Sequence, residues 1–130
     1  MDGPAASGKG TLARRIAAHF SYAYLDTGSL YRALAYDVLR RSEAPADASA
    51  GLRAAKALDP AMLDDPDILA ALRTDAVGTA ASVVAAQPDT RAAILKIQRD
   101  IAYTPPDGKA GAVLDGRDIG TIVCPDAAHK

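Results

Sequence analysis

Apolar side chains recur at helical spacing along most of the chain. Between residues 11 and 20, Leu12, Ile16 and Phe20 fall on one face, which predicts a helix. Comparable spacing in three later segments predicts helices over residues 29–41, 75–86 and 89–101. Gln87-Pro88 separates the last two, because proline breaks a helix from within.

Two short apolar runs have the composition of β-strands. They cover residues 22–25 and residues 112–114, and the second run ends in Asp115-Gly116-Arg117-Asp118. We expect a further element to begin within residues 120–123. Strands that alternate with helices are typical of an α/β protein with a parallel sheet, which places its chemistry at the carboxyl ends of the strands.

Residues 42–75 differ in composition from the rest of the chain. They are rich in Ala, Asp and Pro, which indicates an insertion with short helices around residues 50–58 and 67–73. The acidic residues Asp64, Asp65 and Asp67 suggest either a cation site or a solvated turn with helix caps. We favour the capped turn, because no set of ligands surrounds these carboxylates in the sequence.

Composition and charge narrow the possible functions. The chain has 130 residues, of which 49% are hydrophobic, so it can form one compact domain with a modest core. A net charge of -1 argues against a broad nucleic-acid-binding surface. The single cysteine, Cys124, excludes an internal disulfide framework, and we expect it to be buried rather than nucleophilic. Without a membrane-length apolar run or a leader, we expect no membrane partner and a cytoplasmic location.

The first residues of the chain carry its most specific motif. Two glycines separated by four residues, with lysine directly after the second, describe a phosphate-binding loop whose backbone N–H groups turn toward an anion. The general pattern has Ser or Thr directly after the lysine, whereas this chain has one glycine between them. The loop is Gly3, Pro4, Ala5, Ala6, Ser7, Gly8, Lys9, Gly10 and Thr11. The alternative is an ordinary loop that caps a helix.

The helix predicted from residue 29 has Tyr31 and Arg32 in its first turn. Arg32 follows Thr27 and Gly28, which are typical of a turn. Such an arginine can be a solvated surface charge, but its position beside a polar corner favours contact with a ligand.

Three motifs together resemble bacterial cytidylate kinases. They are the phosphate loop, Leu25-Asp26-Thr27-Gly28-Ser29-Leu30-Tyr31-Arg32, and Asp115-Gly116-Arg117-Asp118-Ile119-Gly120-Thr121, with Ala80-Ala81-Ser82 between the last two. The resemblance implies a P-loop nucleoside monophosphate kinase fold, in which a parallel sheet is flanked by helices. It also implies transfer of the γ-phosphoryl group of ATP to CMP or dCMP, with Mg²⁺. Residues 1–130 are then a partial kinase domain with a mostly helical monophosphate-binding insert at roughly 42–86.

The resemblance also assigns roles to individual residues. Residues 3–11 match the ATP loop, with the Thr11 hydroxyl beside Mg²⁺, and the expected catalytic cations are Lys9, Arg32 and Arg117. The residues that match acceptor-binding positions are Thr27, Tyr31, Arg32, Ser82, Arg91, Arg117 and Asp118. Spaced cations offset the repulsion between two polyanions, and a carboxylate such as Asp118 can accept a hydrogen bond from the exocyclic amine of cytosine.

The chain departs from the family at both ends. The family's strand before Gly3 and everything after Lys130, including the lid, are missing from it. We therefore expect an incomplete, monomeric fragment with weak or no activity, whose partners are ATP, CMP and dCMP. The alternatives are a P-loop kinase for another small acceptor and a non-catalytic nucleotide-binding module.

Overall fold

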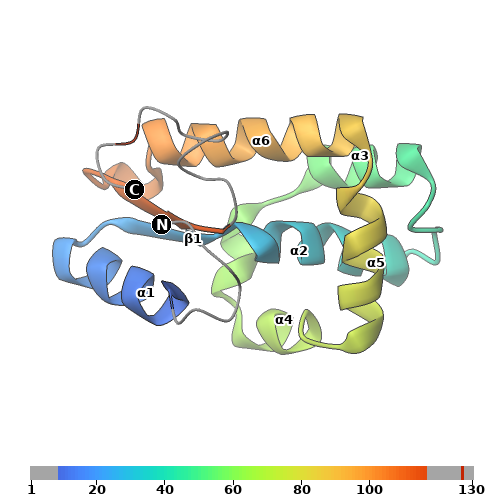
Figure 1. Ribbon diagram of the computed structural model, residues 1–130, viewed down its shortest axis with the longest axis horizontal. Coiled ribbons are helices and arrows are strands. Elements are labelled where there is room, and N and C mark those ends of the chain that lie inside the picture. The colour runs from blue at the N-terminus through green and yellow to red at the C-terminus, as the bar shows by residue number, and fades with distance from the viewer. Residues whose placement is uncertain (1–8, 117–126, 128–130) are drawn as a thin grey trace. The chain divides into compact units, whose positions relative to one another are not determined.

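The computed structural model describes residues 9–116 and residue 127, and these form two compact units (Figure 1). Of the described residues, the sheet unit comprises 9–28, 95–116 and 127, and the helical unit comprises 29–94. Two helices, α2 (Thr27–Arg40) and α6 (Pro88–Tyr103), each contribute residues to both units.

Among its described residues, the sheet unit contains two parallel strands, β1 (Ala23–Asp26) and β2 (Ala112–Asp115). They pair in register from Ala23 opposite Ala112 to Asp26 opposite Asp115, which confirms both predicted strands and the parallel sheet. Along β1 the buried Ala23 and Leu25 alternate with half-buried residues, as expected for a strand covered on one face. The two strands therefore end in carboxylates at the same edge of the sheet.

Helix α1 (Lys9–Phe20) contacts both strands, but not through the apolar stripe that predicted it. Within residues 11–20 of α1 the buried side chains are Ala13 and Ala17, whereas Leu12 is 51% exposed and Phe20 is 57% exposed. Small side chains allow a helix to approach strands closely. The helix is thus confirmed, while its buried face differs from the face with the largest apolar side chains.

The helical unit is built from short helices around the middle of α2. After α2 come α3 (Ala48–Ala57), the 3-10 helix η1 (Pro60–Asp64), α4 (Pro66–Ala71) and α5 (Asp75–Ala85). A second 3-10 helix, η2 (Pro106–Gly108), precedes β2 in the sheet unit. These bounds confirm the helices predicted around residues 29–41, 50–58, 67–73, 75–86 and 89–101. The sequence did not predict the two short 3-10 helices, η1 and η2. A monophosphate-binding role for the helices within 42–86 stays a prediction.

The core of the helical unit consists of side chains with the predicted spacing. Leu30, Leu34 and Val38 of α2 are buried, as are Val84 of α5 and Ile94 of α6. Burial of each such side chain contributes about 1.5–3 kcal/mol to folding. The sequence pattern therefore identified the inward face of α2 correctly.

Aspartates cap the short helices of residues 42–75. Asp47, Asp59 and Asp65 accept hydrogen bonds from backbone N–H groups two residues ahead, over distances from 2.9 to 3.0 Å. Each bond satisfies an N–H group that the first helical turn leaves open. The cap reading is confirmed for Asp65, which lies in the acidic cluster.

None of the helices among residues 9–116 is both long and apolar enough to span a membrane.

Candidate functional site

The predicted donor site falls at the start of the described chain. Gly3, Pro4, Ala5, Ala6, Ser7 and Gly8 lie outside the described residues, as do Arg117, Asp118 and Cys124. The described part begins at Lys9, and the last three residues of the predicted loop, Lys9, Gly10 and Thr11, are the first residues of α1. The further element expected within residues 120–123 also lies outside the described residues.

The N-terminus of α1 is electrostatically suited to an anion. Its first turn contains no acidic residue, and Thr11 is exposed there. The N-terminal end of a helix carries a partial positive charge and open N–H groups, both of which favour phosphate.

Two aspartates meet at the carboxyl edge of the sheet. Asp26 and Asp115 are partners in the parallel register, and Asp115 is buried. The Thr27 hydroxyl donates a hydrogen bond to the backbone carbonyl oxygen of Asp115 at 2.9 Å, which ties the start of α2 to the end of β2. The oxygen of that hydroxyl keeps lone pairs that can accept another bond. Asp26 accepts a hydrogen bond from the Gly28 N–H at 3.1 Å.

Tyr24 lies beside these carboxylates, and burial together with their negative charges shifts its pKa. Its hydroxyl donates to Oδ2 of Asp115 at 3.3 Å. Burial raises the pKa of Tyr24 to about 12, helped by the negative charges of Asp26 and Asp115 and partly opposed by Arg14. The Arg14 guanidinium carbon lies 5.4 Å from the centre of the Tyr24 ring, so it also makes a cation–π contact. Tyr24 is therefore a neutral hydrogen-bond donor near neutral pH.

Asp115, Asp26 and Tyr24 were not among the predicted site residues. For the two aspartates the signal was the acidic end of each strand, which the pattern of apolar runs does reveal. The role of Tyr24 had no sequence signal, because it depends on pairing across the sheet.

The helical unit holds a cleft with a volume of about 360 Å³. Its lining is polar and comes from α2, from the turn before α5 and from one face of α5. The lining residues are Arg32, Arg73, Thr74, Asp75, Gly78, Thr79 and Ser82. The structure thus brings together Arg32 and Ser82, two predicted acceptor-binding residues that are fifty positions apart. Arg73 was not among the predicted residues.

Hydroxyl groups and a helix terminus line one side of the cleft. Thr74 caps α5, and its Oγ1 accepts a hydrogen bond from the Val77 N–H at 3.4 Å. The Ser82 hydroxyl donates to the Gly78 carbonyl oxygen at 3.3 Å, so its remaining lone pairs can accept from a ligand.

Tyr31 and Arg91 lie outside the lining of this cleft. Burial raises the pKa of Tyr31, and the positive charge of Arg91 opposes that rise. The Arg91 guanidinium donates to the Ala85 carbonyl oxygen at 3.0 Å, at the last residue of α5. Contacts of these two side chains with a nucleotide stay predictions.

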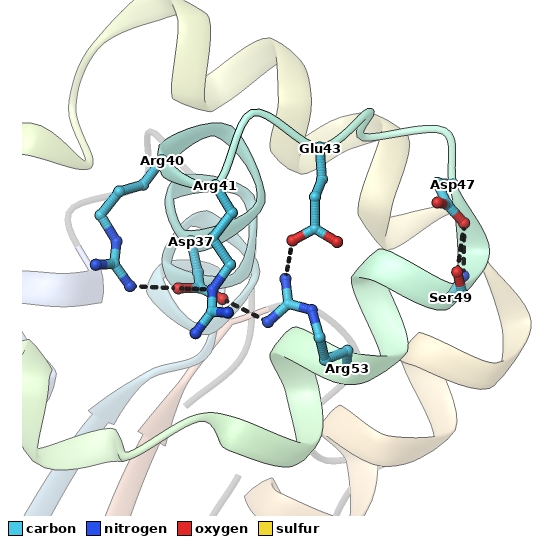
Figure 2. A network of polar contacts seen from close by, with 7 residues as sticks. All are labelled: Asp37, Arg40, Arg41, Glu43, Asp47, Ser49 and Arg53. Atoms are coloured by element: carbon cyan, nitrogen blue, oxygen red, sulfur yellow. Dashed lines mark hydrogen bonds and ion pairs between the residues drawn. The ribbon is translucent and has the colours of Figure 1, made fainter.

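A second cleft of the helical unit, with a volume of about 310 Å³, is electrostatically different. Its lining includes Asp37, Arg40 and Arg41. Figure 2 shows that the Asp37 carboxylate accepts hydrogen bonds from both of these arginines and from Arg53. Arg53 also forms an ion pair with Glu43. Burial raises the pKa of Asp37, but the hydrogen bonds from Arg40 and Arg53 outweigh this and hold it below its usual value. The cations at this cleft are thus already paired within the protein.

The part of the chain that the structure describes is a mixed α/β protein. It has a small parallel sheet of two strands with carboxylates at one edge, together with helices and a cleft that contains arginines. All 130 residues match the family described as cytidylate kinase, and the chain belongs to that family.

Individual relatives agree with this assignment. The chain is 60% identical to the cytidylate kinase of Rhodospirillum rubrum, 55% to that of Paramagnetospirillum magneticum and 53% to that of Rhodopseudomonas palustris. Each comparison covers the whole chain, which spans only 58% or 59% of the length of these relatives.

Proposed function

We propose that this chain carries the acceptor site and part of the donor site of a cytidylate kinase with a P-loop nucleoside monophosphate kinase fold. The reaction transfers the γ-phosphoryl group of ATP to CMP or dCMP and yields ADP with CDP or dCDP. The observation that supports it most directly is that Arg32 and Ser82 line one cleft, since the family resemblance assigns both to the acceptor independently of their positions in the fold.

The cleft suits a nucleoside monophosphate in size and chemistry. Its volume of about 360 Å³ falls in the usual range for small-ligand sites. The planar guanidinium of Arg32 can bind two phosphate oxygens at once, and the hydroxyl of Ser82 offers an acceptor to the ribose or base. Asp118 is proposed to accept from the cytosine amine, which discriminates against uracil, because uracil presents a carbonyl there.

The donor is proposed to bind at the loop that leads into α1. The backbone N–H groups of residues 3–10 and the N-terminus of α1 attract the ATP phosphates, and Lys9 adds a positive charge. Arg117, from the segment after β2, is proposed to contribute a further cation.

The residues of the sheet unit fit Mg²⁺ by their donor chemistry. Mg²⁺ usually takes one or two carboxylates together with substrate phosphates, and Asp26 and Asp115 meet at one edge of the sheet. Thr11 supplies a hydroxyl oxygen in the first turn of α1. When bound, Mg²⁺ would neutralise part of the charge on the β- and γ-phosphates.

The chemistry demands positioning more than acid–base catalysis. An oxygen of the acceptor phosphate attacks the γ-phosphorus, and the bond between that phosphorus and the bridging oxygen to the β-phosphate breaks, so ADP leaves with that oxygen. The acceptor oxygen is already ionised near neutral pH, so no strong base is needed. Fixed cations such as Lys9 and Arg32 stabilise the charge that spreads over the transferred group.

The test measures turnover and binding separately on the 130-residue chain. ADP release with ATP and Mg²⁺ is followed with CMP, dCMP, UMP or AMP as acceptor, and calorimetry measures the binding of each acceptor. We expect CMP and dCMP to bind and to stimulate release weakly above the acceptor-free rate, and Arg32→Met to weaken CMP binding and to abolish that stimulation.

Arg40→Met is the matched control, because it removes an arginine of the same helix that pairs with Asp37 and lies outside the acceptor cleft. It should leave the binding of CMP unchanged. Equal responses to CMP and AMP would indicate a kinase for another acceptor. CMP binding without turnover would favour a non-catalytic module, and the absence of both would refute the proposal.

A further inference from the structure

The cleft contains a second arginine to which none of the sequence motifs pointed. Arg73 lies between the end of α4 at Ala71 and the start of α5 at Asp75. Two contacts hold its backbone in place. The preceding Leu72 is buried, and the Arg73 N–H donates a hydrogen bond to the Ala70 carbonyl oxygen at 3.2 Å. The following residue, Thr74, caps α5. An exposed guanidinium is therefore carried on a turn that is held from both sides.

The charges of the cleft are not balanced within the protein. Across residues 9–116, no ion pair joins Arg32 or Arg73 to a carboxylate, although Asp75 lines the same cleft. The arginines of the neighbouring network differ, since Arg40, Arg41 and Arg53 all pair with Asp37. Two unpaired guanidinium groups that line one cleft repel each other, and an anion bound between them relieves that repulsion.

We propose that Arg73 binds the phosphate of the acceptor nucleotide together with Arg32. This role depends on the proposed kinase function, because it requires that the cleft binds a nucleoside monophosphate. A phosphate monoester carries a charge between about -1.5 and -2 near neutral pH, which matches two guanidinium groups better than one. Arg73 thereby makes the cleft selective for a monophosphate over the corresponding nucleoside.

The selectivity has a pH signature. The second proton of a phosphate monoester is lost with a pKa of about 6, so the dianion predominates above that pH. With both arginines present, the affinity for CMP should rise as the pH increases through this range. Removal of one guanidinium should flatten the rise, whereas a merely structural role of Arg73 would not change its slope.

The experiment is a calorimetric titration of the 130-residue chain with CMP, cytidine and inorganic phosphate. Compared with the wild type, Arg73→Met should weaken CMP about 10- to 100-fold, which corresponds to loss of one hydrogen-bonding contact to a charged group. The affinity for cytidine should not change. Arg73→Lys should recover part of the loss, since it keeps the charge but not the planar fork. Circular dichroism confirms that each variant is folded.

Two reference variants separate the possible failures. Arg40→Met should bind CMP like the wild type, and Arg32→Met should weaken it. If Arg32→Met weakens CMP but Arg73→Met does not, the role of Arg73 is refuted while the proposed acceptor cleft stands. If the wild type binds no CMP, the proposed function fails and the role of Arg73 fails with it. An equal loss of CMP and cytidine affinity in Arg73→Met would also refute phosphate recognition.

Discussion

Gly51 lies on the buried face of α3, where a methyl group would have no room. A Cβ atom at this position would come within 2.7 Å of Oε1 of Gln87 and 3.0 Å of Oγ1 of Thr90. Thr90 is fully buried, and Nε2 of Gln87 donates to the Pro45 carbonyl oxygen at 2.8 Å. Neither neighbour can therefore move away without disturbing other contacts.

The cost of Gly51→Ala follows from these contacts. Alanine in place of glycine within a helix ordinarily stabilises by about 0.5–1 kcal/mol. Here overpacking costs about 1–3 kcal/mol, and displacement of Gln87 costs about 1 kcal/mol more through its lost hydrogen bond. We therefore expect Gly51→Ala to lower the free energy of unfolding by about 1–3 kcal/mol.

Gly78 provides a matched control in α5. Gly51 and Gly78 are each the fourth residue of their helices, and each helix begins with a side-chain cap, but a Cβ at Gly78 would meet nothing within 4 Å. Gly78→Ala should therefore stabilise by about 0.5–1 kcal/mol. Urea denaturation followed by far-ultraviolet circular dichroism measures both variants. If Gly51→Ala proves as stabilising as Gly78→Ala, the packing reasoning is wrong.

Three further predictions concern single side chains. Tyr24, whose pKa is raised to about 12, should ionise in a step near that pH in a near-ultraviolet titration, and Tyr24→Phe should remove that step. Because the folded state keeps this proton while the unfolded chain loses it, stability should decline from about pH 10 toward pH 12 in the wild type and less so in the variant. Burial raises the pKa of Asp37, but the hydrogen bonds from arginines outweigh burial and lower the pKa below its usual value. Arg53→Met should therefore reduce the melting temperature at neutral pH and have little effect once acid protonates Asp37. A deficit of the same size in acid would contradict this. Thr74→Ala should cost about 1 kcal/mol in the same denaturation assay by removing the cap of α5, whereas Thr74→Ser should not; equal stabilities would exclude the cap.

The sequence by itself was sufficient for the local elements. The stripe of Leu30, Leu34 and Val38 identified α2 and its buried face, and two apolar runs located β1 and β2. Helical periodicity and strand composition are properties of neighbouring residues, so they can be read without knowledge of the rest of the chain. The motifs likewise pointed to Arg32 and Ser82 through the family resemblance.

The tertiary structure alone decided which face of α1 is buried and which residues share a site. Leu12 and Phe20 remain exposed because α1 packs on the sheet through Ala13 and Ala17. The pattern of hydrophobic residues along the chain does not predict this buried face. Arg73 belongs to no motif, and it reaches the cleft because a turn between two short helices carries it there. Contacts between residues far apart in sequence depend on how helices pack, and that packing is set by the shape of whole surfaces rather than by any local pattern.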